Sequence, residues 1–100
     1  MSFHYILHES AQADYETSLK WYVDRSRQAA ENFVTAVENG LHLICNNPTR
    51  WRNTYRHFYE INLKNYPFSI VYAIDEGQKM VIVTAIYHHK RNPRRKYRKL

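Results

Sequence analysis

Apolar side chains recur with a helical period in the first half of the chain. A short aromatic and β-branched stretch at residues 3–7 favours a strand, and the 3.6-residue period that follows predicts helices at residues 10–25 and 27–46. Ser10 and Ser26 stand where N-caps are expected. The two apolar stripes therefore predict a helical hairpin in which each helix buries one face.

The second half alternates with a period of two, which is the pattern of strands. Such segments span residues 55–63, 68–75 and 80–88, and Gly77 in the last turn is available for a positive φ. The order β-α-α-β-β-β predicts an α+β fold, with the helical hairpin packed on a mainly antiparallel four-stranded sheet and a basic C-terminal tail. A single domain covers residues 1–100. The expected core includes Phe33, Val37, Leu41, Ile70, Tyr72 and Ile82.

Charge is divided unevenly between the two halves. Residues 1–50 carry four basic and six acidic side chains, whereas residues 51–100 carry eleven basic and three acidic ones, within a formal net charge of +6. The last fifteen residues, IYHHKRNPRRKYRKL, supply seven lysines and arginines and no carboxylate. Such a field favours a polyanion or an acidic protein as partner.

The sequence argues against a reactive cysteine and against a metal site. Cys45 is the single cysteine and lies on the apolar stripe of the second helix, which is typical of a small buried residue. His4 and His8 would lie about 13 Å apart along a strand, and His88 and His89 would point to opposite faces. No metal or other cofactor is therefore expected.

The compartment follows from what the sequence lacks. The N-terminus has no basic region followed by an apolar stretch, and the longest apolar run is far shorter than a membrane span. We therefore expect a cytoplasmic protein without a membrane partner. With only two glycines, the chain also has no glycine-rich phosphate loop and no Gly-x-Ser-x-Gly motif.

The basic C-terminal stretch is the candidate functional region. One interpretation is a solvated tail; the alternative is a working surface, because the stretch follows directly from an apolar strand. Imidazole, phenol and guanidinium groups can bind phosphate, stack on bases and move protons near neutral pH. In a metal-independent endoribonuclease, Arg91 would stabilise phosphate charge while Tyr97 and His88 handled protons. The residues expected to bind nucleic acid or another target are Arg56, His89, Lys90, Arg94, Arg95, Lys96 and Arg98.

Four segments together resemble the RelE/ParE superfamily of toxins from bacterial type II toxin–antitoxin modules, often called plasmid stabilisation proteins. They are ADYETSLKWYVDRS, AAENFVTAVENGLHLICNNP, YPFSIVYAID and VIVTAIYHHKRNP. The resemblance spans nearly the whole chain and implies a β-α-α-β-β-β core and growth inhibition. It also implies a cognate antitoxin that wraps the toxin with an acidic, amphipathic segment.

The resemblance leaves the cellular target open between two branches. RelE-like members cut messenger RNA on the ribosome with an arginine in the middle strand, an arginine after the last strand and a C-terminal tyrosine; Arg91 and Tyr97 match the last two. The middle-strand arginine would fall at about Ser69. YPFSIVY and the His-x-x-Arg-x-Pro motif at residues 88–93 are more similar to the ParE side, whose members poison DNA gyrase. We therefore favour gyrase, with a non-catalytic nucleic-acid-binding module or a degenerate toxin as further alternatives.

Overall fold

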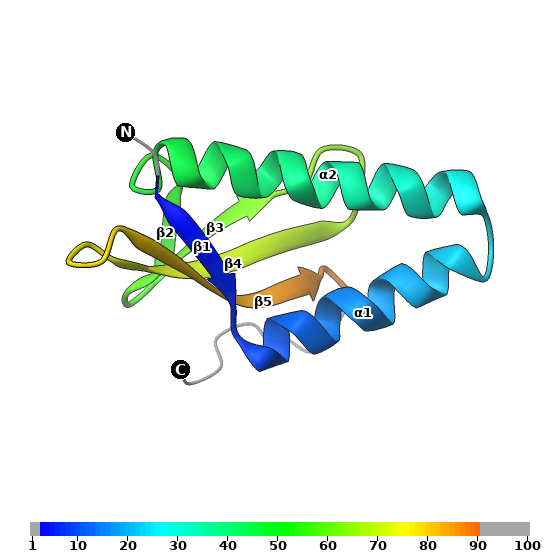
Figure 1. Cartoon of the computed structure of the whole chain (residues 1–100), viewed down its shortest axis with the longest axis horizontal. Helices are drawn as coiled ribbons and strands as arrows, with labels where there is room; N and C mark the ends of the chain where they lie inside the picture. Colours follow the sequence, from blue (N-terminus) through cyan, green and yellow to red (C-terminus); the bar gives the residue numbers. More distant parts are fainter. Residues whose placement is uncertain (1–2, 91–100) are drawn as a thin grey trace.

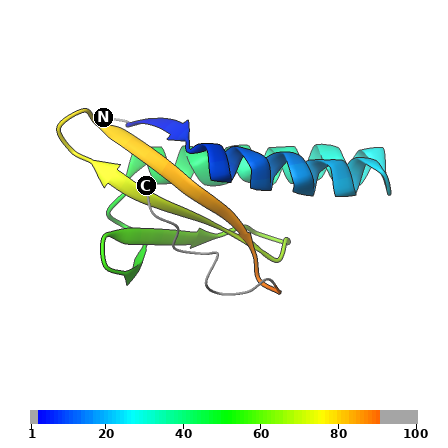
Figure 2. The ribbon, with the colours of Figure 1, turned by 90° about the horizontal axis from the view of Figure 1, so that it is seen from below.

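Two helices pack on one face of a five-stranded sheet in the computed structural model, which describes residues 3–90 (Figure 1). The elements in chain order are β1 (His4–Leu7), α1 (Glu9–Val23), α2 (Arg27–Asn46), β2 (Arg52–Tyr55), β3 (Phe58–Asn62), β4 (Phe68–Asp75) and β5 (Met80–His88). The view from below shows the helices and the sheet as two layers (Figure 2). The α+β class and the helical hairpin are confirmed, whereas the predicted number of four strands is wrong.

The sheet has the strand order β1-β5-β4-β3-β2. β1 runs parallel to β5, and the other neighbours are antiparallel. β5 is therefore an interior strand with a partner on each side, in agreement with its apolar residues on both faces. The first and the last strand of the described chain lie side by side.

The fifth strand arises because the segment predicted as one strand, residues 55–63, belongs to two strands joined by a tight turn. Arg56 and His57 form this turn between paired Tyr55 and Phe58. Arg56 has a φ of 52°, which costs on the order of 1 kcal/mol for a residue other than glycine. The side-chain amide of Asn53 donates hydrogen bonds to the carbonyl oxygens of Arg56 (3.0 Å) and Phe58 (2.9 Å). Without glycine, proline or asparagine at the turn itself, the usual signal of a hairpin was missing.

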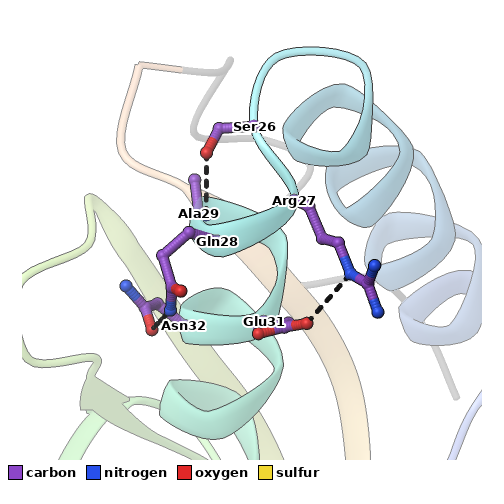
Figure 3. A network of polar contacts seen from close by, with 6 residues as sticks. All are labelled: Ser26, Arg27, Gln28, Ala29, Glu31 and Asn32. Carbon is purple, nitrogen blue, oxygen red and sulfur yellow. Dashed lines mark hydrogen bonds and ion pairs between the residues drawn. The ribbon is translucent and has the colours of Figure 1, made fainter.

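α2 has the predicted bounds, whereas α1 spans Glu9–Val23 rather than residues 10–25. Ser26 caps α2 as expected, because its hydroxyl accepts a hydrogen bond from the Ala29 N–H at 3.2 Å (Figure 3). α1 is capped by His8 rather than Ser10, and the His8 ring nitrogen accepts from the Ser10 N–H at 3.3 Å. The positive φ predicted for Gly77 occurs instead at Lys79, where φ is 54°.

α1 takes over as the partner of β5 where β1 ends. The Ser10 hydroxyl donates to the Thr84 carbonyl at 2.9 Å, and the Ile86 N–H donates to the buried carboxylate of Asp14 at 3.1 Å. These side chains satisfy backbone groups of β5 that the short β1, which ends at Leu7, does not reach. The first helix is therefore fixed to the sheet by hydrogen bonds as well as by apolar packing.

The core lies between the helices and the sheet. Five of the six expected core residues are at most 5% exposed: Phe33, Val37, Leu41, Ile70 and Tyr72. Ile82 is only partly buried, because its neighbours Val81 and Val83 point into the main core and side chains alternate along a strand. Neither helix among residues 3–90 combines the length and the apolar character needed to cross a membrane.

Tyr72 makes the stability of this core sensitive to alkaline pH. Its side chain is fully buried and its hydroxyl donates to the Pro48 carbonyl at 2.6 Å. Burial raises the pKa of Tyr72 above the ordinary value of 10.0. A raised pKa means that the folded state holds the proton more tightly, so stability is full below pH 10 and falls above it, by up to about 1.4 kcal/mol per pH unit.

We therefore expect Tyr72→Phe to be less stable than the native chain at pH 7, by about 1 kcal/mol, because the Pro48 carbonyl loses its donor. The same variant should lose less stability between pH 10 and pH 11.5. Urea unfolding at pH 7, 10 and 11.5 measures both effects. Equal losses of stability above pH 10 in the two proteins would contradict the role given to Tyr72.

A polar cluster at the end of the last strand

The end of β5 meets the end of β3 and the beginning of β4 at one end of the sheet (Figure 1). In the register of the ladder, Ser69 on β4 lies between Asn62 on β3 and Tyr87 on β5. His89 follows β5 directly, and its N–H donates to the Pro67 carbonyl at 2.9 Å. The beginning of the basic C-terminal stretch is therefore fixed to the sheet by the backbone.

A chain of hydrogen bonds connects the three strands at this point. The Ser69 hydroxyl donates to Oδ1 of Asn62 at 2.6 Å and lies 2.8 Å from Nε2 of His89. A hydroxyl has one proton, so Nε2 of His89 must be the donor in the second bond. Ser69 is fully buried while His89 is exposed. The array fixes the His89 ring with Nε2 protonated and leaves Nδ1 as its acceptor.

His88 lies on the opposite face of the sheet. Its ring meets Phe68 edge-on at 4.9 Å between centroids, and its Nδ1 accepts the Lys90 N–H at 3.1 Å. Beside it is a cavity of about 370 Å³ between α1 and the sheet, whose lining is Thr17, Ser18, Trp21, Tyr22, Pro67, Phe68 and His88. The two neighbouring imidazoles therefore serve two different surfaces.

The structure gathers some of the predicted site residues and separates one. His88, His89 and Lys90 are together at the end of β5. Arg56 lies at the β2–β3 turn, at the opposite end of the sheet, and does not join them (Figure 1). The remaining predicted site residues, Arg91, Arg94, Arg95, Lys96, Tyr97 and Arg98, lie outside the described residues.

Two members of the cluster were not predicted as site residues. From the sequence, Ser69 is only an uncharged position in the middle strand, and no pattern of residues singles out Asn62. Side chains alternate along each strand, so Asn62 and Ser69 can lie on the same face of the sheet, but only the register of β3 against β4 makes them neighbours.

Cys45 is buried, and burial raises the pKa of its thiol, as expected for an unreactive residue. Among residues 3–90 no three His, Cys, Asp or Glu side chains gather into a metal site.

The hydrogen-bond array predicts the tautomer of His89. In the native chain, the ¹⁵N shifts of a neutral His89 ring should show a proton on Nε2, because Ser69 accepts from it. Ser69→Ala should remove the bias and give a mixture of both tautomers. His88 serves as an internal control, because its own contact to Lys90 is unchanged. A proton on Nδ1 of His89 in the native chain would show that the array is assigned in the wrong direction.

A family model decides the relationship of the chain to known proteins. The model described as the ParE toxin of the type II toxin–antitoxin system parDE matches residues 5–93. The chain belongs to the ParE toxin family. None of the curated proteins matches the chain at a significant level.

Solved structures share the fold of this ParE family member. The chromosomal ParDE toxin–antitoxin system of P. aeruginosa matches with a TM-score of 0.74 at 15% identity, covering 87% of this chain and 96% of the other. The intact E. coli RelBE toxin–antitoxin complex matches with a TM-score of 0.61 at 14% identity, covering 90% and 100%. The RelBE2 complex of Mycobacterium tuberculosis matches with a TM-score of 0.61 at 13% identity, covering 88% and 99%. At these identities the likeness extends to the fold alone.

Proposed function

We propose that this toxin inhibits growth by docking on DNA gyrase rather than by cutting RNA. The observation that supports this choice is Ser69, which occupies the middle strand as a buried, uncharged residue whose hydroxyl is engaged by both Asn62 and His89. β3 and β4 contain no lysine or arginine. RNA cleavage without carboxylates or metal depends on cations that stabilise a charged phosphate in the transition state. The strands beside His89 offer none.

Within this function, we propose that Arg91 and Tyr97 dock on the target at fixed positions, beside His88, His89 and Lys90. The cations at Arg94, Arg95, Lys96 and Arg98 would add diffuse attraction, which is screened by salt. The support for this division is the attachment of residues 88–90 to the sheet by the His89 and Lys90 N–H groups. Arg91 follows this fixed segment directly in the sequence.

We further propose that a cognate antitoxin neutralises the toxin with an acidic, amphipathic segment. The support is the family description, which names a toxin–antitoxin system, and the net positive charge of residues 51–100. Three of the solved structures with the same fold are toxin–antitoxin systems. Affinity for the antitoxin should fall as salt increases, because opposite charges steer and hold the complex.

The gyrase proposal is tested with the purified toxin and two assays. Supercoiling by gyrase should be inhibited, while a message on translating ribosomes should stay intact. Co-expression of the antitoxin should restore growth after the toxin is induced. Intact supercoiling together with cleaved message would overturn the proposal in favour of RelE-like RNA cleavage. RNA cleavage is the second candidate function because two histidines lie close to Arg91 in the sequence and could transfer protons.

A further inference from the structure

The sheet has a second buried face, opposite the one that packs against the helices. Ile70 and Tyr72 of β4 point into the core between helices and sheet, so Val71 between them points to the other side. An apolar cluster forms on that side, and we name it the second-face cluster: Phe58, Val71, Ala85 and Tyr87. Its four side chains are between 0% and 7% exposed. The second face is therefore shielded from water almost as well as the main core.

Neither helix among residues 3–90 covers the second-face cluster, because both pack on the opposite face (Figure 2). The solvated face of an antiparallel sheet usually carries polar side chains, whereas this cluster is apolar. The burial is also local. Ile6 on β1 pairs with Ile82, which lies on the same face as the cluster, yet Ile6 is 50% exposed. The cluster therefore needs a cover that lies over β3, β4 and β5 but not over β1.

A carboxylate lies within the same face, beside the cluster. Glu60 of β3 pairs with Val71 in the register of the sheet and is 4% exposed. The Arg52 guanidinium of β2 forms an ion pair with it at 3.8 Å, a separation longer than a hydrogen bond. A buried carboxylate is stable where cations and hydrogen-bond donors surround it. A cover that carries positive charge is therefore favoured at this face, and an acidic one is repelled.

The chain turns toward this face after β5. His89 lies in the turn that follows the strand, and its ring is 6.5 Å between centroids from the ring of Tyr87 in the cluster. The chain continues with residues 91–100, of which six are lysine or arginine and none is acidic. The segment that begins at the edge of the second face therefore carries the charge that Glu60 favours.

We propose that residues 91–100 cover the second-face cluster and that Arg94 and Arg95 bind the carboxylate of Glu60. The register places Glu60 about 13 Å along the sheet from His89 and about 10 Å across two strand spacings, so roughly 16 Å away. Five to six extended residues span about 16 to 20 Å. Counted from His89, this length reaches Arg94 and Arg95.

Charge distinguishes this occupant of the face from two others. The acidic antitoxin segment proposed above would bring like charge to Glu60, and a second copy of the sheet would bring the same carboxylate. The attached basic segment brings opposite charge and needs no second molecule. An anchor at Arg94 and Arg95 lies between Arg91 and Tyr97 in the sequence, so it would hold both docking residues in place. Only this last consequence rests on the proposed function.

The test of the cover uses the full chain with ¹³C-labelled methyl groups and measures nuclear Overhauser effects from the methyls of Val71 and Ala85. We expect contacts with side-chain protons of residues 91–100 of the same chain. An equal mixture of labelled and unlabelled chains separates these contacts from contacts between copies. If the methyls show no contact with residues 91–100, or contact them only between copies, the proposal is overturned.

A double-mutant cycle tests the pairing with Glu60. Arg94→Gln with Arg95→Gln should raise the equilibrium constant for unfolding about tenfold, because a buried carboxylate loses a charged hydrogen-bond donor. In the Glu60→Gln background the same change should have less than a twofold effect, because the partner charge is already absent. Urea unfolding measures both.

The matched control is Arg98→Gln with Lys99→Gln, which removes two charges from the same segment. It should change the unfolding constant less than twofold in both backgrounds, since these charges remain in water. Equal effects of the Arg94 and Arg95 changes with and without the Glu60 charge would overturn the pairing. Gyrase and antitoxin are absent from these samples, so failure here is distinguishable from failure of the supercoiling test.

Discussion

Ile70→Ala should lower the free energy of unfolding by about 2 to 5 kcal/mol, the largest stability effect that we expect of a single substitution. Ile70 is fully buried on β4, between Ile61 of β3 and Ile86 of β5. It also packs against α2, because its Cδ1 lies 3.0 Å from where a side chain at Gly40 would begin. Truncation of Ile70 would leave a cavity between α2 and the sheet. Neither α2 nor the sheet can move in to fill this cavity without losing other packing contacts. Urea denaturation measures the loss.

Ile6→Ala is the matched control for this substitution. Ile6 is the same residue type in the same sheet but is 50% exposed. Its truncation should cost less than about 1 kcal/mol. In a chain of this size a difference of 2 kcal/mol between the variants corresponds to a melting temperature lower by about 10 °C. If both variants melted together, the core would have to lie elsewhere.

Arg91→Ala should abolish growth arrest while leaving fold and antitoxin binding largely intact. The reason is its place in the sequence, one residue beyond Lys90, whose N–H is bound to the His88 ring. A charge that directly follows an anchored segment can contact a target at one fixed position. Neighbouring cations at other positions cannot replace that contact when it is lost. Induced expression in growing cells measures the effect. Tyr97→Phe is expected to behave in the same way.

Arg98→Ala tests whether position matters or charge alone. It removes the same side chain from the same stretch and should reduce toxicity little, since diffuse attraction falls only gradually as charges are removed. Both variants should still bind the antitoxin, which shows that they are folded. If Arg91→Ala and Arg98→Ala weakened toxicity to the same small extent, the stretch would be a general source of charge rather than a set of docking residues.

Helical periodicity was the part of the fold most readily predicted from the sequence. α2 begins and ends where the pattern predicted, because its apolar residues recur without interruption and Ser26 supplies a strong cap. The β2–β3 hairpin could not be predicted in the same way. Its turn uses Arg56 in a conformation that the residue type disfavours, stabilised by Asn53 from outside the turn. The pattern of apolar and polar residues does not show that Asn53 stabilises this turn.

Only part of the candidate site could be predicted for a similar reason. The basic stretch is visible in the composition, and the alternation of a strand separates His88 from His89. The array of Asn62, Ser69 and His89 depends on the register between three strands, which the hydrophobic pattern does not specify for polar residues. The same holds for Arg56, whose distance from the end of β5 follows from the direction of β3 in the sheet.

The parallel pairing of β1 with β5 has a consequence for the time at which the toxin is complete. Leu7 pairs with Val83, so the strand made first has no partner until the strand made last among the described residues is available. Contacts between residues so distant in sequence form late and slowly. At synthesis rates of about 5 to 20 residues per second, roughly 4 to 15 s pass between the two strands. During this interval the sheet of a nascent chain is incomplete, and the complete fold can form only after β5 has been made.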